Sequence, residues 1–149
     1  MRQFVIFGIG RFGESIARTL WDLGHEVLAV DKQEDKIQRI SEKVTHAIQA
    51  DATDENSLKL IGIRNFDVAI VTIGEDIQSS TLITLLCKEA GVKHVVAKAQ
   101  NELHAKLLYK VGADKVVLPE RDMGIRVARS LVSSNFLDYI QLTPHYQLV

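Results

Sequence analysis

The chain has 149 residues, enough for about one domain, and 46% of them are hydrophobic, which excludes an intrinsically disordered protein. Its 18 basic and 19 acidic side chains nearly cancel, so the overall charge argues against a nucleic-acid partner. The single cysteine, Cys87, excludes an internal disulfide and fits a reducing cytoplasm, and no apolar stretch approaches the ~20 residues of a membrane-spanning helix.

Short apolar runs alternate with helix-like segments along the chain. The runs have branched apolar residues at successive positions, as in parallel strands that are covered on both faces; they are residues 4–7, 27–30, 46–49, 68–72, 95–99 and 115–118. The predicted helices are residues 11–23, 34–43, 55–60, 81–90, 103–111 and 121–132. This alternation predicts an α/β fold, a Rossmann-like doubly wound sheet of six parallel strands with a nucleotide at its switch point.

The C-terminal segment is less regular than the rest. We expect residues 1–132 to form the nucleotide-binding domain and residues 133–149 to form a crossover helix or tail. An amphipathic helix there would carry Phe136, Leu137, Tyr139 and Ile140 and would end near Pro144. Docking on another subunit and packing on its own domain both explain such a helix.

A glycine turn follows the first predicted strand. Gly8 permits the tight turn, Gly10 lets the backbone approach a pyrophosphate, and Gly13 lets the next helix pack close to the strand. The free amides and the dipole of that helix favour a phosphate at its start. Phe12 lies in this turn, as does Arg11, which either reaches the phosphates or faces solvent. We therefore expect an adenine nucleotide as the ligand.

Asp31 ends the second predicted strand, near the spacing at which an acid binds the ribose hydroxyls of adenosine. Its charge would repel the 2′-phosphate of NADP, although Lys32 could neutralise that phosphate. Capping of the following helix is the alternative role for Asp31.

Further candidates follow the third and fourth strands. Asp51, Ala52 and Thr53 lie where the adenine edge is expected, and Asp51 either accepts from the adenine amino group or caps the next helix. Ile73 and Gly74 come after the fourth strand. Gly74 either lets the backbone pass beneath the ribose or phosphates or simply serves a turn.

Lys98 ends the fifth strand inside an otherwise apolar run, so it needs a counter-charge. Bound phosphate is one candidate, and Asp76 or Glu120 is the intramolecular alternative.

Several kinds of catalytic site are missing from the pattern. The five histidines, His104 among them, have no metal-ligand spacing, and Cys87 lies among leucines as a buried thiol would. No Walker lysine follows the glycines. A dehydrogenase also needs a region for substrate and proton transfer, and little of the chain is left to form one. The sequence therefore favours a sensing module over an enzyme.

With these residues in hand, the chain resembles the N-terminal nucleotide-binding half of the RCK (KTN) proteins, the cytosolic regulatory subunits of bacterial Trk/Ktr-type potassium uptake systems. The resemblance covers residues 4 to about 142. It rests on the glycine turn and on residues 24–31, 51–53, 98–101, 112–114 and 119–124. The last three segments are the most specific, and they look more Ktr-like than Trk-like.

The resemblance implies a homodimer, extended in some members to an octameric ring beneath an integral-membrane potassium transporter. The protein would be cytoplasmic and peripheral to the inner face of the membrane. Exchange of ATP for ADP, or of NADH for NAD in some Trk-type members, would gate ion flow. Family members usually carry a second, C-terminal RCK domain, which this chain lacks.

The resemblance also implies roles by position. The glycines would hold phosphates, Asp31 the ribose, and Asp51 and Ala52 the adenine side. Arg11 would read the triphosphate at a subunit interface. Glu120 would contribute to a magnesium or calcium site between paired subunits, since one carboxylate alone is a poor site for such a cation; the alternative is a helix-start acid.

Asp51 stands where some Ktr-type members have asparagine, which leaves ATP and NAD both open. The remaining alternatives are an NAD(H)-binding redox sensor and the cofactor domain of an NAD-dependent oxidoreductase.

Overall fold

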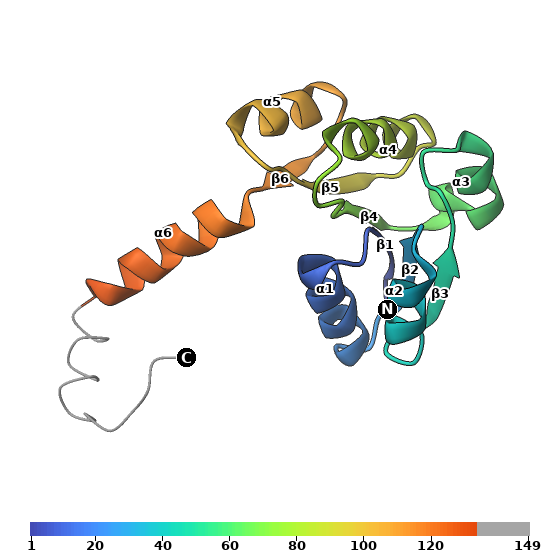
Figure 1. The fold of residues 1–149 in the computed structure, drawn as a ribbon, viewed down its shortest axis with the longest axis horizontal. Coiled ribbons are helices and arrows are strands. Elements are labelled where there is room, and N and C mark those ends of the chain that lie inside the picture. The colour runs from blue at the N-terminus through green and yellow to red at the C-terminus, as the bar shows by residue number, and fades with distance from the viewer. Residues whose placement is uncertain (134–149) are drawn as a thin grey trace. The chain divides into compact units, whose positions relative to one another are not determined.

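The computed structural model describes residues 1–133, and its two compact parts, Met1–Val117 and the chain from Leu118 onward, are described separately. Residues 1–117 form a six-stranded sheet in the order β3-β2-β1-β4-β5-β6, with every neighbouring pair parallel. Strand order reverses between β1 and β4, which are neighbours in the sheet (Figure 1). The doubly wound sheet of six parallel strands is thus confirmed.

The strands are β1 (Gln3–Phe7), β2 (Glu26–Asp31), β3 (His46–Gln49), β4 (Val68–Val71), β5 (His94–Lys98) and β6 (Lys115–Val117). The helices are α1 (Arg11–Asp22), α2 (Glu34–Ile40), α3 (Glu55–Ile61), α4 (Ile77–Glu89), α5 (Glu102–Lys110) and α6 (Pro119–Leu131), with a short 3₁₀ turn, η1 (Ile63–Asn65).

Helices cover both faces of the sheet, α1 and α2 on one side and α4 and α5 on the other (Figure 1). Successive residues of a central strand are buried for this reason, as Val5, Ile6 and Phe7 in β1 are. Ile6 belongs to the cluster beneath α1 and α2, together with Ala17, Ala29 and Ile40. The expectation of strands covered on both faces is confirmed.

Helix α4 begins at Ile77, four residues before the predicted start. The cause is Asp76, whose carboxylate accepts hydrogen bonds from the amide of Ser79 at 3.0 Å and from its hydroxyl at 2.6 Å. Such a cap satisfies amides that lack a partner in the first turn of a helix. The predicted start at residue 81 overlooked this cap.

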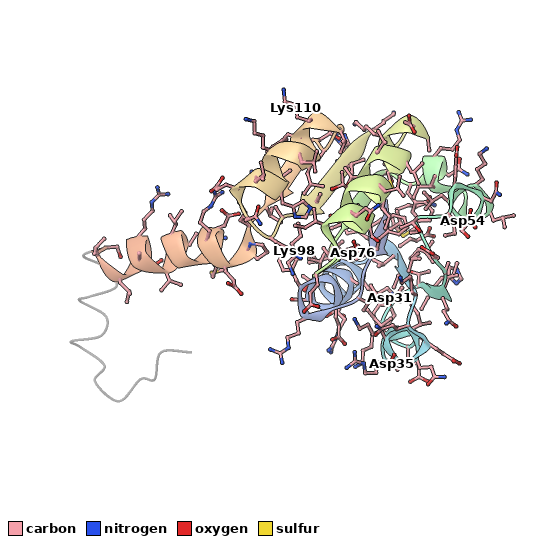
Figure 2. The ribbon with its side chains drawn as sticks, turned by 45° about the horizontal axis from the view of Figure 1, so that its top comes forward. Asp31, Asp35, Asp54, Asp76, Lys98 and Lys110 are labelled. Atoms are coloured by element: carbon pink, nitrogen blue, oxygen red, sulfur yellow. The ribbon has the colours of Figure 1, made fainter. Side chains whose placement is uncertain are left out.

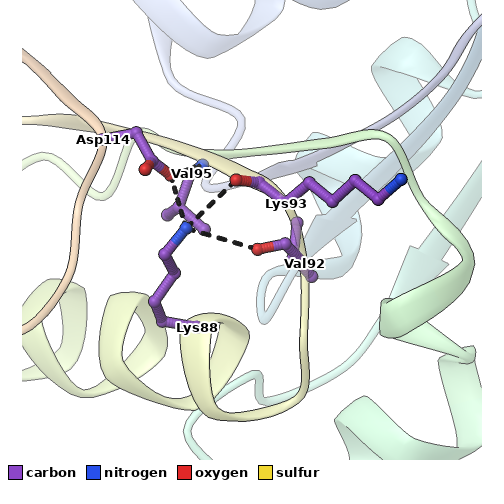
Figure 3. A network of polar contacts seen from close by, with 5 residues as sticks. All are labelled: Lys88, Val92, Lys93, Val95 and Asp114. Carbon is purple, nitrogen blue, oxygen red and sulfur yellow. Dashed lines mark hydrogen bonds and ion pairs between the residues drawn. The ribbon is translucent and has the colours of Figure 1, made fainter.

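A polar network fastens the two turns at the amino end of β5 (Figure 3). The ammonium of Lys88 in α4 donates to the Lys93 carbonyl at 3.1 Å and to the Asp114 carboxylate at 2.7 Å. Asp114, just before β6, also accepts from the Val95 amide at 2.8 Å. Burial raises the pKa of Asp114, but the hydrogen bonds from Lys88 and Val95 outweigh it and leave that pKa lowered.

Helix α6 begins with Pro119 at its first position, where a missing N–H costs nothing. Met123, Val127 and Leu131 recur along one of its faces and are 56%, 47% and 40% exposed. The amphipathic helix expected within residues 133–149 lies outside the described residues. None of the helices in residues 1–133 combines the length and apolarity needed to cross a bilayer.

Candidate functional site

A cavity of about 440 Å³ opens at the carboxyl ends of the central strands, beside the start of α1. Asp31, Asp76 and Lys98 reach it from three different segments (Figure 2). Twelve residues named from the sequence line it: Gly8, Gly10, Arg11, Phe12, Asp31, Lys32, Asp51, Ala52, Thr53, Ile73, Gly74 and Lys98. Because parallel strands end at one edge of a sheet, residues far apart in the sequence meet there.

Gly13 is the predicted binding residue that does not line the cavity. A Cβ at this position would lie 2.2 Å from the Gly8 carbonyl oxygen and 2.6 Å from Oγ1 of Thr72. Gly8 itself has a φ of +92°, and Thr72 donates to its carbonyl at 2.6 Å. Gly8 and Gly13 therefore serve the close packing of the turn, α1 and β4.

Gly10 differs from these two glycines. Its φ is −85°, which any residue adopts, and a Cβ here would meet nothing within 4 Å. Since Gly10 also lines the cavity, a side chain at this position would project into the space that a ligand needs. The fold does not require this glycine, and the space in front of it is open.

The N-terminus of α1 has no side-chain cap. Within residues 1–133, no acceptor meets the amides of Arg11, Phe12 and Gly13, whereas Asp54, Asp76 and Asn101 cap α3, α4 and α5. Three N–H groups at the positive end of a helix dipole are thus left without an acceptor, and two of the residues that carry them, Arg11 and Phe12, line the cavity. This is the usual arrangement for binding a phosphate.

Asp31 holds the glycine turn against the end of β2. Its carboxylate accepts from the amides of Ile9 at 2.7 Å and Gln33 at 2.8 Å. The N-cap of α2 is Gln33, so the alternative role of Asp31 as that helix's N-cap is wrong. A carboxylate has about four acceptor positions, so two are left for hydroxyl groups.

Asp51 forms a local turn with Thr53. One carboxylate oxygen accepts from the Thr53 hydroxyl at 2.6 Å and from its amide at 3.0 Å, and these bonds, the hydroxyl bond foremost, lower the pKa of Asp51. The carboxylate is therefore ionised at neutral pH. Capping of α3 falls to Asp54 instead, so the capping alternative for Asp51 is wrong.

Lys98 reaches the cavity from the end of β5, and its ammonium lies 6.0 Å from the ring centroid of Phe12. Among the residues that the structure describes, Lys98 has no ion-pair partner. Asp76, one alternative partner, is occupied by Ser79, whose hydroxyl foremost lowers the pKa of that carboxyl. A cation at a cavity with only a weak aromatic contact suits an anionic ligand.

Ten lining residues were not predicted as binding residues, although Asp76 was named as an alternative partner of Lys98: Phe7, Val30, Gln33, Lys36, Ala50, Thr72, Glu75, Asp76, Ser79 and Ile83. Six of them lie at or beside positions that the sequence indicated. Phe7, Val30 and Thr72 are the last residues of predicted strands, and Gln33, Ala50 and Glu75 adjoin Lys32, Asp51 and Gly74. Lys36 follows Lys32 by one helical turn, a spacing that the sequence shows.

A polar network that was not predicted from the sequence lies beside the cavity. His104 is 2% exposed, and its Nδ1 accepts from the Gln100 amide at 3.0 Å. Nε2 therefore carries the ring proton and donates to Ser80 Oγ at 2.8 Å. Burial lowers the pKa of His104, so the ring is neutral at neutral pH.

Glu120 lies in the first turn of α6, in the second compact part. Within residues 1–133, no three His, Cys, Asp or Glu side chains gather in a way that could hold a metal ion. The described residues of one chain therefore do not form a cation site, and the metal-binding role of Glu120 stays a prediction.

Comparison with known proteins gives this arrangement a context. Ktr system potassium uptake protein A of Bacillus subtilis (strain 168) is 50% identical over 148 residues, which cover 99% of this chain and 67% of that protein. The protein of the same name from Vibrio alginolyticus is 42% identical over 138 residues, 93% of this chain and 63% of its own length. The chain thus spans about two-thirds of these relatives.

Solved structures share the fold at low sequence identity. The TrkA-N domain of inner membrane protein YbaL from Escherichia coli has a TM-score of 0.79 at 18% identity and covers 89% of this chain and 97% of its own. The GsuK channel bound to NAD (TM-score 0.70, 19% identity) covers 78% of this chain and 21% of its own. The Kef CTD of Shewanella denitrificans in AMP-bound form (0.69, 19%) covers 91% and 85%.

The family model described as the TrkA-N domain matches residues 4–119, which include the glycine turn, every strand except the first residue of β1, and the whole cavity. With relatives at 50% identity that are named as Ktr potassium uptake proteins, the resemblance to the RCK nucleotide-binding half is confirmed. This chain belongs to the TrkA-N domain family.

Proposed function

We propose that the chain binds an adenine nucleotide in the cavity beside α1 and acts, without catalysis, as a regulatory part of a potassium uptake system. The uncapped start of α1 carries this proposal. Its three free amides and the open space above Gly10 suit a phosphate chain that approaches the backbone closely.

The lining residues fit the remaining parts of such a ligand. Asp31 would bind the ribose hydroxyls with the acceptor capacity that Ile9 and Gln33 leave unused. Asp51, Ala52 and Thr53 would border the adenine. Lys32 and Lys98 would neutralise phosphate charge, and Ile73 and Gly74 would form a further part of the wall.

Arg11 would distinguish a triphosphate from a diphosphate. It is the first residue of α1, it lines the cavity, and its side chain is exposed, so it can reach beyond the second phosphate or toward a neighbouring copy. A ligand shifts a conformational equilibrium only by its difference in affinity for the two states. A γ-phosphate contacted by Arg11 in one state would supply that difference.

The potassium transporter partner comes from the relatives, which are named as Ktr potassium uptake proteins. In this proposal the chain is cytoplasmic and peripheral to the inner face of the membrane. It pairs as a homodimer, within an octameric ring where the assembly is complete, and Glu120 from paired copies contributes to a magnesium or calcium site.

Calorimetric titration with ATP, ADP, NAD and NADH tests the proposal. We expect ATP and ADP to bind with micromolar or tighter dissociation constants, and an Arg11→Ala variant to lose affinity for ATP more than for ADP. Absence of binding by all four nucleotides would overturn the nucleotide site.

NAD(H) is the second candidate ligand. It is favoured by Asp31 at the end of β2, the position that binds the ribose of NAD in dinucleotide folds, and by the NAD-bound GsuK channel among the structures of the same fold. NADH binding without ATP binding would make the chain a redox sensor. Hydride transfer to a substrate by the full-length protein would make it the cofactor domain of an oxidoreductase.

A further inference from the structure

Residues 73–75 form one wall of the cavity, between the end of β4 and the cap of α4. The segment is held at both ends, by the Thr72 amide bound to the Phe7 carbonyl at 2.8 Å and by the Asp76 cap. Within residues 1–133, its own backbone has one hydrogen bond, donated by Nε2 of Gln100 to the Gly74 carbonyl. A Cβ at Gly74 would meet nothing within 4 Å, so close packing does not fix this position either.

Gln100 is exposed, yet its backbone is anchored. Its amide donates to Nδ1 of the buried His104, whose Nε2 binds Ser80 Oγ on α4. The His104 amide in turn donates to Oδ1 of Asn101, the N-cap of α5, at 2.8 Å. The arrangement is similar to a capping box, except that the side chain at the third helical position binds the amide before the N-cap and not that of the N-cap itself. The base from which the Gln100 side chain extends is therefore fixed.

We propose that Gln100 is a positioning residue of the nucleotide site, which holds the Gly74 carbonyl and with it the wall of residues 73–75, and that His104 fixes Gln100 for this task. This inference rests on the proposed function. Lys98 precedes Gln100 by two residues, so one short segment sets both the ammonium that would face the phosphates and the wall of residues 73–75.

The expected effect is a loss of affinity without a loss of ligand contacts. Without the Gln100 hydrogen bond, the wall of residues 73–75 samples more conformations. A nucleotide must then order this wall on binding, and the lost conformational entropy weakens its affinity. Loss of one such hydrogen bond corresponds to a roughly three- to tenfold increase in the dissociation constant.

Gln100→Met tests the contact, because methionine keeps the length of the side chain and removes the N–H donor. Gln3→Met is the matched control, since Gln3 is also exposed and donates to Glu26 at 3.0 Å at the amino end of the sheet. We expect Gln100→Met to raise the dissociation constants of ATP, ADP and NAD and to speed hydrogen exchange at residues 73–75. We expect the same melting temperature and nucleotide affinity from Gln3→Met as from the wild type.

Two variants of His104 test the anchor. Asparagine can offer an acceptor near the place of Nδ1 and so keep the Gln100 bond, whereas glutamine can reach Ser80 but leaves the Gln100 amide without that acceptor. We expect His104→Asn to bind nucleotide more tightly than His104→Gln when each is measured well below its own melting temperature. Equal dissociation constants for the two would overturn the role of His104.

The outcomes separate the two proposals. A wild-type chain that binds none of the nucleotides overturns the proposed function. A wild type that binds them, with Gln100→Met binding equally well and exchanging residues 73–75 at the wild-type rate, overturns the positioning role alone.

Discussion

Three glycines in one turn have two different physical reasons to be there. Gly8 and Gly13 are required by the fold, through a positive φ at the first and a contact of 2.2 Å that any Cβ would make at the second. Gly10 is required by neither its backbone angles nor its neighbours. The motif could be recognised from the sequence, but this division could not, because it depends on the position of β4.

Gly10→Ala is therefore expected to lower nucleotide affinity, and Gly13→Ala is expected to lower the stability of the fold. Gly10→Ala should fold with a free energy of unfolding within about 1 kcal/mol of wild type and bind nucleotide at least about tenfold more weakly, since its methyl group occupies ligand space. Gly13→Ala should be destabilised by several kcal/mol or fail to fold, as overpacking against backbone predicts. Thermal denaturation and calorimetry measure the two effects, and unchanged affinity in Gly10→Ala would contradict the placement of the phosphates.

Asp31 illustrates a residue whose structural task was hidden in the sequence. The expected ribose contact stays a prediction, while the structure shows two backbone amides on its carboxylate. We expect Asp31→Ala to lower the free energy of unfolding by about 1–3 kcal/mol even without ligand, because both amides lose their acceptor. Chemical denaturation of the ligand-free variant checks this, and stability equal to wild type would mean that water replaces the carboxylate at no cost.

At the scale of elements, the predicted helix boundaries were accurate where the sequence signal for a helix start was recognised. Helix α1 was predicted from its first residue because the glycine turn marks it, whereas α4 was predicted four residues late because the cap at Asp76 went unrecognised. The Gln100–Gly74 bond joins residues 26 apart in loops that no local pattern connects. Such a contact forms because β4 and β5 are neighbours in the sheet. It therefore could not be predicted from the local sequence of either loop.

The buried His104 in the first turn of α5 makes the free energy of unfolding depend on pH. Burial lowers the pKa of His104, so the unfolded chain binds a proton at a higher pH than the folded chain does. The stability that neutral His104 contributes is therefore complete above its unfolded pKa of about 6.5 and is lost as the pH falls toward the folded value.

We expect unfolding free energies measured from pH 7.5 to pH 5 to fall for the wild type, by at most about 1.4 kcal/mol per pH unit from this one group. His104→Asn should remove the part of this pH dependence that comes from His104. His94→Asn, a substitution at an exposed position, should leave that part unchanged. Equal slopes in the wild type and His104→Asn would contradict a buried neutral ring.

At the scale of the whole molecule, the described chain divides after Val117, and α6 was predicted correctly apart from a start two residues late and an end one residue late. The sequence predicts an apolar side with Ile125, Val127, Ala128, Leu131 and Val132, and the structure adds Met123, four residues before Val127. What covers such a face cannot be derived from the pattern. The proposed homodimer gives it an occupant, a second copy of the chain.

Val127→Glu should therefore shift the chain from dimer toward monomer in light scattering after size-exclusion chromatography. A charge in the centre of an apolar helix contact has to be desolvated on association, which weakens the dimer. Arg129→Glu, about 200° farther around the helix, is the control. A wild type that is monomeric at all concentrations tested would contradict the homodimer.

The free amides at the start of α1 have a consequence for energetics as well as for recognition. If the missing acceptor is supplied by a nucleotide, then the ligand itself completes the secondary structure, and folding and ligand supply become one linked equilibrium. At a free nucleotide concentration 100 times the dissociation constant, the folded state gains about 2.7 kcal/mol. The resistance of the chain to heat and proteases would then report the adenylate level around it.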